Sequence, residues 1–432
     1  GDLGYRFSLS STAPIPPIPT EPGARLGVAT GHEATYGSFL VSSGPYMIEG
    51  SDHLDFTKPP PEQQPVSGYI PGRSLTLVRN PSWRASTDGL RKAYPDRIVF
   101  AIGGTEERDS REVVAGTQDT LYETDPSASD VRRYQADPTL RDRVFINPAD
   151  VIRYLTMNLA VPPFDDVHVR KAVNEVLDKR RILGLAASTH LHLSGPFGGD
   201  SAQHLAPDSL EDNLLVDYRP YPSPNDRGDL TKAKAEMRQS PYDGNGDGVC
   251  DASVCQNVLA VTRNDEPFYA AQAKVVRQNL ASIGIHLHVQ ALDDMYGAIG
   301  DPTQRVPMGL GILFLKDFPN ASTFFDGVFT GNGIEQGLNY SLVGATPDQL
   351  TGWGYRVTRV PTVDAKVAEC TPLIGDAQAR CWAELDQLLM EQIVPWVPYE
   401  AGNRIRIVSA RVASFSFDQF TTLPALDRIG LK

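Results

Sequence analysis

The stretch from residue 258 to residue 292 contains two strand patterns with a helix pattern between them, and this order restricts the fold most. VLAVTR, Val258 to Arg263, is rich in apolar and β-branched residues, as strands are. IHLHVQAL, residues 285–292, alternates apolar and polar residues like a half-exposed strand. Between them, Pro267 to Ile283 places apolar or small residues at helical spacing. This succession predicts a βαβ unit, in which two parallel strands are joined by a crossover helix.

A second segment, residues 161–183, predicts a core helix. It reads VPPFDDVHVRKAVNEVLDKRRIL and enters from an extended, proline-rich arm. Asp165 or Asp166 can cap the helix N-terminus, where the helix dipole also favours acidic side chains. Val169, Ala172 and Val173 then begin an apolar stripe at helical spacing. The segment therefore predicts an amphipathic helix that packs on a domain core.

Further elements precede and follow these two segments. Ser74 to Trp83 and Asp96 to Ile102 have strand patterns, and Ser110 to Gly116 is a short helix ending at glycine. Leu310 to Leu315 is a later strand, and Arg380 to Ile393 is the last clear helix. With 432 residues, the chain is long enough for two or three domains or for one large two-lobed body.

Five short motifs follow one another along the chain. They read GPYMI, LVRNPSW, DRIVF, AGTQD and PFDDVHVRKA, at Gly44–Ile48, Leu77–Trp83, Asp96–Phe100, Ala115–Asp119 and Pro163–Ala172. In this order they resemble motifs of the bacterial solute-binding proteins of ABC importers, family 5, which includes the oligopeptide- and dipeptide-binding receptors. Each motif alone is common, but the ordered set is specific.

The resemblance implies a two-lobed α/β fold of the type II periplasmic-binding-protein kind, with mixed sheets flanked by helices and a hinge between the lobes. We expect residues 1–149 and 401–432 to form lobe I and residues 150–400 to form lobe II. Family members begin with a strand of the first lobe and an additional small domain, to which no stretch here corresponds. We therefore expect lobe I to be incomplete relative to the family.

The candidate ligand-binding residues are Arg263, Phe314, Asp317 and Phe318. Arg263 ends a predicted strand just before a helix, where open α/β sheets place ligands, and Asp317 follows another strand. An arginine fork suits a carboxylate, and an aspartate suits an ammonium group. In the dipeptide-binding members that this chain resembles, an arginine at this position holds the ligand carboxylate. There, the aspartate of a W-x-x-D motif holds the amino group, and Phe314 replaces that tryptophan here. Solvated charges or local ion pairs are the alternative for Arg263 and Asp317.

Four cysteines form two close pairs, Cys250 with Cys255 and Cys370 with Cys381. Even number and close pairing favour two disulfides and an extracytoplasmic setting over free thiols. The loop around the first pair resembles the first half of a calcium loop, but its twelfth position is Val254 rather than glutamate. A structural calcium ion and a plain turn are equal alternatives, and we expect no other cofactor. The candidate calcium ligands are Asp243, Asn245, Asp247, Val249 and Asp251.

Charge and motifs exclude several classes of protein. With 40 basic and 53 acidic residues the net charge is −13, which argues against nucleic acid as the main partner. The sequence has no G-x-S-x-G elbow, P-loop or H-E-x-x-H motif, so we do not expect an enzyme. The N-terminus has no signal-peptide layout, and no segment is long and apolar enough to span a bilayer. We expect a mature or excised chain.

The resemblance implies a function in uptake. We expect a monomeric, extracytoplasmic solute-binding protein, periplasmic or membrane-associated at the cell surface. It captures a peptide or similar small polar solute between its lobes and presents it to an ABC permease. One alternative is the ligand-sensing domain of a larger regulatory or fusion protein. The second is a hydrolase whose catalytic site the sequence does not reveal.

Overall fold

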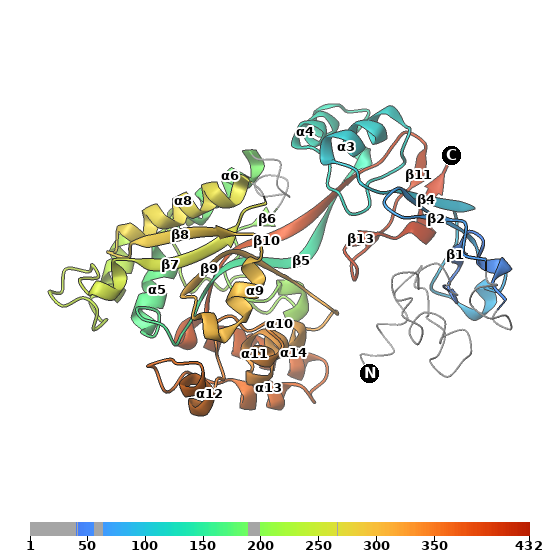
Figure 1. Ribbon diagram of the computed structural model, residues 1–432. Helices are drawn as coiled ribbons and strands as arrows, with labels where there is room; N and C mark the ends of the chain where they lie inside the picture. Colours follow the sequence, from blue (N-terminus) through green and yellow to red (C-terminus); the bar gives the residue numbers. More distant parts are fainter. Residues whose placement is uncertain (1–39, 41, 56–63, 189–198, 266) are drawn as a thin grey trace. The chain divides into compact units, whose positions relative to one another are not determined.

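The computed structural model describes residues 40, 42–55, 64–188, 199–265 and 267–432, and it divides into two units (Figure 1). Unit 1 comprises the chain up to Asn147 and the segment Ile405–Lys432, and unit 2 is Pro148–Arg404. Two strands carry the chain from one unit to the other, β5 (Val144–Met157) and β10 (Trp396–Ile407). The predicted lobe boundaries, after residues 149 and 400, fall within these strands.

Unit 1 contains a small antiparallel sheet built on β3 (Ser74–Arg79). β1 (Tyr46–Ile48), β2 (Tyr69–Ile70) and β4 (Arg97–Ala101) all pair with it. The strands predicted from Ser74 and from Asp96 are thereby confirmed. The hydrophobic core beside this sheet contains the buried side chains of Tyr46, Ile48, Val66, Leu77 and Ala93.

Two helices of unit 1 pack near Ile407, the last residue of β10. α3 (Glu106–Ala115) begins four residues before the predicted start, because the Thr105 side chain accepts a hydrogen bond from the backbone N–H of Arg108. α4 (Ala128–Ala136) follows. Val113, Leu121, Tyr134 and Ile407 form their shared core. The remaining strands are β11 (Val412–Ser414), β12 (Phe417–Asp418), β13 (Leu423–Pro424) and β14 (Gly430–Leu431), and the 3₁₀ turns are Ser51–His53, Ala85–Thr87, Arg141–Arg143 and Leu426–Arg428.

Unit 2 is built on a six-stranded mixed sheet with the order β6-β10-β5-β9-β7-β8 (Figure 1). β6 is Gly199–Asp200, β7 is Val258–Arg263, β8 is Leu287–Leu292 and β9 is Met308–Leu315. β7 is parallel to both β8 and β9, whereas β5 is antiparallel to β9. The parallel pair β7 and β8, joined through a helix, confirms the predicted βαβ unit.

Helices cover both faces of this sheet (Figure 1). Successive residues of a strand point to opposite faces, so Val258 and Ala260 of β7 enter one core while Leu259 and Val261 enter the other. The first core is covered by α5 (Val167–Val176), α6 (Lys179–Ser188), α7 (Leu230–Met237) and α8 (Pro267–Ala281). The 3₁₀ turns of this unit are Asp208–Glu211, Pro224–Asp226, Ser253–Cys255 and Pro302–Gln304.

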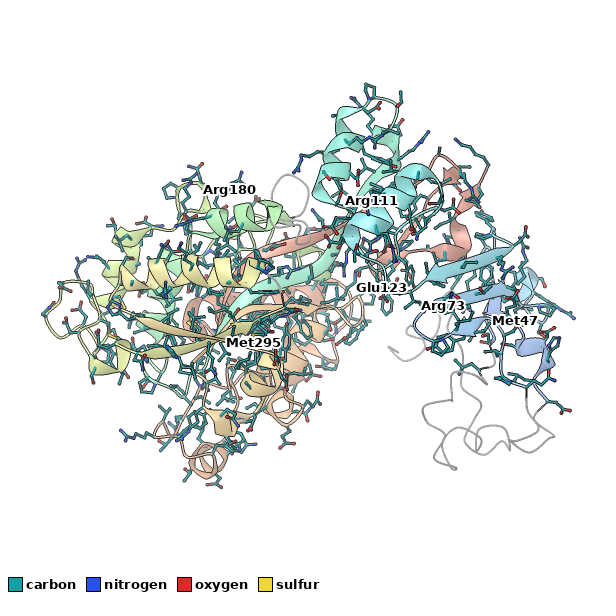
Figure 2. All side chains as sticks on the ribbon, turned by 45° about the horizontal axis from the view of Figure 1, so that its top comes forward. Met47, Arg73, Arg111, Glu123, Arg180 and Met295 are labelled. Atoms are coloured by element: carbon teal, nitrogen blue, oxygen red, sulfur yellow. A yellow bond between two sulfur atoms is a disulfide. The ribbon has the colours of Figure 1, made fainter. Side chains whose placement is uncertain are left out.

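The second core is the larger, and Met295 at the start of α9 lies in it (Figure 2). Tyr154 of β5 stacks on Trp396 of β10 there, with ring centroids 3.4 Å apart. The helices that cover it are α9 (Met295–Gly300), α10 (Ser322–Phe329), α11 (Gly331–Glu335), α12 (Pro347–Gly352), α13 (Asp364–Cys370) and α14 (Asp376–Leu388), which continues as a π turn (Leu389–Ile393).

α5 begins where the sequence predicts. Of the two expected caps, Asp166 is the one used, since its side chain accepts a hydrogen bond from the backbone N–H of Val169 at 3.1 Å. Asp165 instead accepts a hydrogen bond from the hydroxyl of Tyr242 at 2.7 Å. Val169 and Val173 are fully buried.

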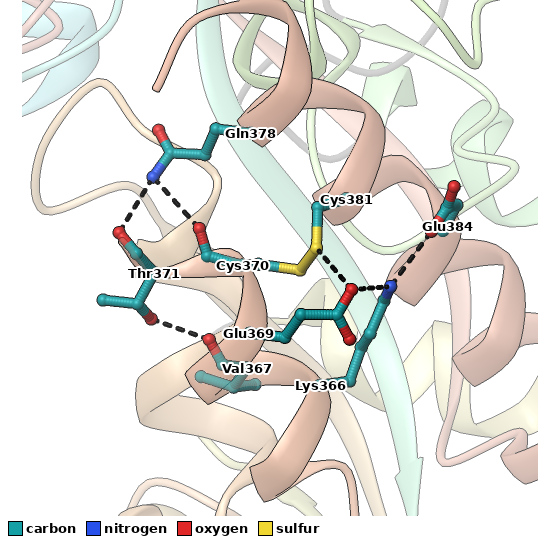
Figure 3. The surroundings of a disulfide bond; sticks show 8 residues. All are labelled: Lys366, Val367, Glu369, Cys370, Thr371, Gln378, Cys381 and Glu384. Atoms are coloured by element: carbon teal, nitrogen blue, oxygen red, sulfur yellow. Dashed lines mark hydrogen bonds and ion pairs between the residues drawn. A yellow bond between two sulfur atoms is a disulfide. The ribbon is translucent and has the colours of Figure 1, made fainter. Parts of the chain in front are cut away.

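Both predicted disulfides are confirmed. Cys250 bonds to Cys255, and Cys370 bonds to Cys381. The second joins α13 to α14, and Gln378 of α14 donates hydrogen bonds to the carbonyls of Cys370 and Thr371 beside it (Figure 3). Within the described residues, no helix is long and apolar enough to cross a membrane.

Candidate functional site

Arg263 lies at the carboxyl end of β7, where the chain turns toward α8. Its Nε donates a hydrogen bond to Asp265 Oδ1 at 3.1 Å, and its Nη2 donates to Asp265 Oδ2. Its guanidinium carbon lies 4.9 Å from the ring centroid of Tyr269, which is a cation–π contact. Burial lowers the pKa of Arg263, but Asp265 and Tyr269 more than offset this, and the pKa lies above its usual value. The side chain is therefore a permanent cation.

A groove of about 590 Å³ opens beside Arg263. The end of β7, one side of α8 and part of β8 line it. Arg263, Lys274 and Arg277 bring three positive charges to the groove, and Asp265 brings one negative charge. Its volume lies in the range of small-molecule sites, about 300–1,000 Å³. The excess of positive charge favours an anionic group of a ligand.

Asp317 follows β9 and is exposed. Its backbone N–H donates a hydrogen bond to Thr323 Oγ1 at 3.0 Å, and the Thr323 hydroxyl donates to Asp317 Oδ2 at 3.4 Å. Phe314 and Phe318, on either side of Asp317, are half-buried. The Phe314 ring contacts Phe324 edge to face, with centroids 5.0 Å apart. The start of α10 therefore holds this predicted segment in place.

The pairing of the parallel strands β7 and β9 is short. Val261 of β7 lies opposite Gly309 of β9, and β9 is irregular after this point, where Gly311 has a φ of 70°. Arg263 and Asp317 thus lie beyond these paired residues, at the carboxyl ends of adjacent strands. For Arg263 the structure shows the local ion pair, and its binding of a ligand stays a prediction.

Sequence reasoning missed two buried ion pairs that involve β5. Lys316 Nζ donates to Asp150 Oδ2, and the Ser209 hydroxyl donates to Asp150 Oδ1 at 2.7 Å. Arg153 Nε lies 3.6 Å from Glu400 Oε2. Burial lowers the pKa of Arg153, but Glu400, Tyr399 and Tyr269 together outweigh it and the pKa is raised. The only signal in the sequence was a charge that interrupts an apolar run, as Lys316 does in LFLKDF.

The acidic loop between α7 and β7 is held by its own hydrogen bonds. The carboxylate of Asp243 accepts from the backbone N–H groups of Gly246, Asp247 and Gly248 at 2.7–3.2 Å. Asp247 in turn accepts from the backbone N–H of Val249 at 2.9 Å. This pattern is the turn that the sequence allowed as an alternative to calcium. Calcium binding by Asp243, Asn245, Asp247, Val249 and Asp251 stays a prediction.

Elsewhere in the described residues, His204, Glu211 and Asp386 form a buried group with the composition and spacing of a metal site. Their ligand atoms all lie within 4.8 Å of one another. Sequence reasoning did not find this group, because Asp386 lies 182 residues from His204. The available signal was the run HLAPDSLE, which contains His204, Asp208 and Glu211.

Residues 5–336 match the family described as bacterial extracellular solute-binding proteins, family 5 Middle. A relative in Sinorhizobium fredii (strain NBRC 101917 / NGR234), the probable peptide ABC transporter periplasmic-binding protein y4tO, is 24% identical over 309 residues. The match covers 66% of this chain and 52% of the relative. The glutathione-binding protein GsiB of Escherichia coli (strain K12) is 24% identical over 263 residues, which cover 60% of this chain and 40% of GsiB. The chain therefore spans about half the length of these relatives, or less.

Solved structures share the fold. The clavulanic acid biosynthesis oligopeptide binding protein 2 superposes with a TM-score of 0.71 and 24% identity, over 90% of this chain and 63% of that one. Haemophilus influenzae OppA in complex with RPPGFSPFR gives a TM-score of 0.62 and 16% identity, over 96% of this chain and 69% of OppA. These likenesses confirm the predicted α/β fold of type II periplasmic-binding proteins. Since the family match also extends over most of the sequence, the chain belongs to the bacterial extracellular solute-binding proteins of family 5.

Proposed function

We propose that this chain forms part of an extracytoplasmic solute-binding protein that captures a peptide, or a similar small polar solute, for an ABC-type importer. Family membership supports this role, as do the names of two relatives, one for peptide transport and the other for glutathione binding. The two disulfides fit an oxidising compartment outside the cytoplasm. The ABC permease is then the partner, and the binding protein acts as a monomer.

The observation that carries the proposal is the state of Arg263. Its side chain is 27% exposed beside the positively charged groove, and Nε and Nη2 already bind a carboxylate, that of Asp265. The C-terminal carboxylate of a peptide presents the same two acceptor oxygens. A ligand can therefore replace or share Asp265 without a change in the hydrogen-bonding geometry of the guanidinium.

Asp317 is the proposed partner for the other end of the ligand. We expect a short peptide to bind with its amino group at Asp317 and its carboxylate at Arg263. The half-buried rings of Phe314 and Phe318 then provide apolar contact beside the amino end.

Thermal melting of the full chain with a panel of di- to pentapeptides and glutathione tests the proposal. A peptide present at 100 times its dissociation constant should stabilise the protein by about 2.7 kcal/mol. We expect Arg263→Ala and Asp317→Ala each to abolish this shift. Arg180→Ala and Asp348→Ala are matched controls, since both residues are exposed and lie on other helices, α6 and α12 (Figure 2 for Arg180).

Modified peptides assign each end of the ligand. Amidation of the peptide C-terminus should weaken binding to the parent chain but should not weaken binding to Arg263→Ala any further. N-acetylation of the peptide should likewise weaken binding to the parent chain but not to Asp317→Ala. Binding that ignores both substitutions and both modifications would rule out this clamp. Mass spectrometry of the recovered peptides separates binding from the hydrolase alternative, because a binding protein returns them intact.

A further inference from the structure

A buried cluster of one histidine and two carboxylates links the segment after β6 to helix α14 in unit 2. His204 and Glu211 lie around the 3₁₀ turn Asp208–Glu211, and Asp386 lies within α14. The side chain of His204 is 6% exposed, and those of Glu211 and Asp386 are fully buried. The cluster is far in sequence from Arg263 and Asp317, and the proposed peptide site does not use it.

The two ring nitrogens of His204 have different surroundings. Nδ1 lies 3.1 Å from Asp386 Oδ2 and 3.7 Å from Glu211 Oε2, so it faces both buried carboxylates. Nε2 lies 3.1 Å from Oδ1 of Asp208, whose side chain is 40% exposed. A histidine whose outer nitrogen donates to a carboxylate while its inner nitrogen faces other ligands has the arrangement of metal-binding histidines.

The two buried carboxylates also differ. Asp386 is oriented by the backbone N–H groups of Leu205 and Ala206, which donate to it at 2.9–3.1 Å. Glu211, in contrast, is fully buried, and neither of its carboxylate oxygens accepts a hydrogen bond from any residue that the structure describes. Burial of a carboxylate without such bonds is costly. Glu211 is thus a buried acceptor that points into the cluster with its bonding capacity unused.

Three carboxylates surround the His204 imidazole: the buried ones of Glu211 and Asp386 and the partly exposed one of Asp208. Tyr218 also lies near the imidazole: its ring centroid is 6.3 Å from that of His204, and its hydroxyl donates a hydrogen bond to Glu391. A divalent cation would neutralise Glu211 and Asp386 together.

We infer that His204 Nδ1, Glu211 and Asp386 bind a divalent transition-metal ion of the zinc class. Asp208 then accepts a hydrogen bond from the Nε2–H of His204 and so orients the imidazole. Ligand atoms at about 2.0–2.1 Å from a tetrahedral zinc ion are about 3.3 Å apart, and the observed separations of 3.1 and 3.7 Å lie on either side of that value. One imidazole with two carboxylates suits Zn²⁺ or Mn²⁺, and lacks the thiolates of Cu⁺ sites. The three ligands leave one position of a tetrahedral ion open, and because they come from both segments, the ion would fasten residues 204–211 to α14.

Metal binding to the full chain tests this inference. Two exposed histidines, His288 on β8 and His286 just before it, can bind Zn²⁺ at the surface, so all proteins carry His286→Ala and His288→Ala. After EDTA treatment and gel filtration, we expect one equivalent of Zn²⁺ per chain by titration calorimetry and by metal analysis. We also expect a raised melting temperature and a visible absorption band with Co²⁺.

Variants locate the ion. Glu211→Gln and His204→Gln should weaken Zn²⁺ binding by about 100-fold or more and remove the Co²⁺ band. Asp208→Asn should weaken binding by about 10- to 100-fold, as expected for an outer partner. Glu391→Gln, an exposed carboxylate in the π turn after α14, should leave binding unchanged. Glu211→Gln is isosteric and removes a buried charge, so circular dichroism should show that it folds.

Two results would overturn the inference. One is a folded parent protein that retains no Zn²⁺, Mn²⁺ or Co²⁺ after exposure to an excess of each. The other is Glu211→Gln binding Zn²⁺ as tightly as the parent. In either case the cluster is a hydrogen-bonded group held by protons, and Glu211→Gln should then melt at the same temperature as the parent or higher. Neither outcome depends on whether the chain binds peptides.

Discussion

Two ion pairs lie at the carboxyl ends of the neighbouring strands β7 and β9, and they differ in burial. The side chains of Arg263 and Asp265 are 27% and 45% exposed, whereas those of Lys316 and Asp150 are 2% and 4% exposed. The first pair joins residues two apart in sequence, and the second joins residues 166 apart. The exposed pair can therefore change partners without disturbing the fold, while the buried pair holds the end of β9 to β5.

The strongest test of this difference is Lys316→Ala. Removing the lysine leaves the buried Asp150 carboxylate without the cation it contacts, so we expect the free energy of unfolding to fall by about 3–5 kcal/mol. Urea unfolding of the variant and the parent measures the change. The double variant Lys316→Met with Asp150→Ala should recover part of the loss, because no buried charge then remains at this pair. A loss below about 1 kcal/mol would mean that the pair behaves like an exposed one.

The disulfide between Cys370 and Cys381 gives a scale for that loss within the same unit (Figure 3). It closes a loop with a sequence separation of 11, and replacing both cysteines by serine should cost about 2–3 kcal/mol. The same urea experiment provides the value. If this cost exceeded that of Lys316→Ala, the covalent link rather than the buried ion pair would be the stronger constraint in unit 2.

Glu175 extends the comparison to a buried carboxyl whose pKa is raised. Burial is the largest cause, and Lys232 offsets it only in part, so the pKa lies at about 7 instead of 4.5. Between these values the folded chain keeps a proton that the unfolded chain has released, so stability falls as pH rises from 4.5 to about 7. Glu175→Gln should reduce this loss in the free energy of unfolding by about 1–2 kcal/mol, after allowance for solvent screening. Parallel melting curves of parent and variant across this range check it; identical pH profiles would contradict it.

Arg263→Ala should show the smallest effect on stability, below about 0.5 kcal/mol, because its ion pair is partly exposed. The same variant should lose the melting shift caused by peptides. A large loss of stability would make Arg263 a structural residue like Lys316, and the contrast between the two strand ends would disappear.

The elements that the sequence predicts well are those with local signals. The βαβ unit, the start of α5 at Asp166 and both disulfides follow from spacing within short segments. The start of α3 was predicted too late, because its first turn, EERD, is polar and hides the helical period. Pro398 and Gly402 suggest a break within β10 (Trp396–Ile407), which the surrounding sheet overrides.

The candidate sites also differ in whether their contacts are local in sequence. Arg263 could be proposed from its place at a strand end, and its contacts with Asp265 and Tyr269 are local. The partners of Lys316 and His204 could not be proposed from the sequence. Asp150 lies 166 residues from Lys316 and Asp386 lies 182 residues from His204, and each pair meets only in the folded unit. Propensity and periodicity describe neighbours in sequence, and these contacts depend on the topology of the whole sheet.

The connection between the units has a consequence for protein engineering. Unit 2 is one uninterrupted piece of chain, and both its ends leave through β5 and β10, which are neighbours in the same sheet. Neighbouring strands lie about 4.8 Å apart, so a linker of a few residues can join the two ends. We therefore expect residues 148–404, joined end to end by such a linker and reopened at the loop residue Ile374, which is 85% exposed, to retain the six-stranded sheet.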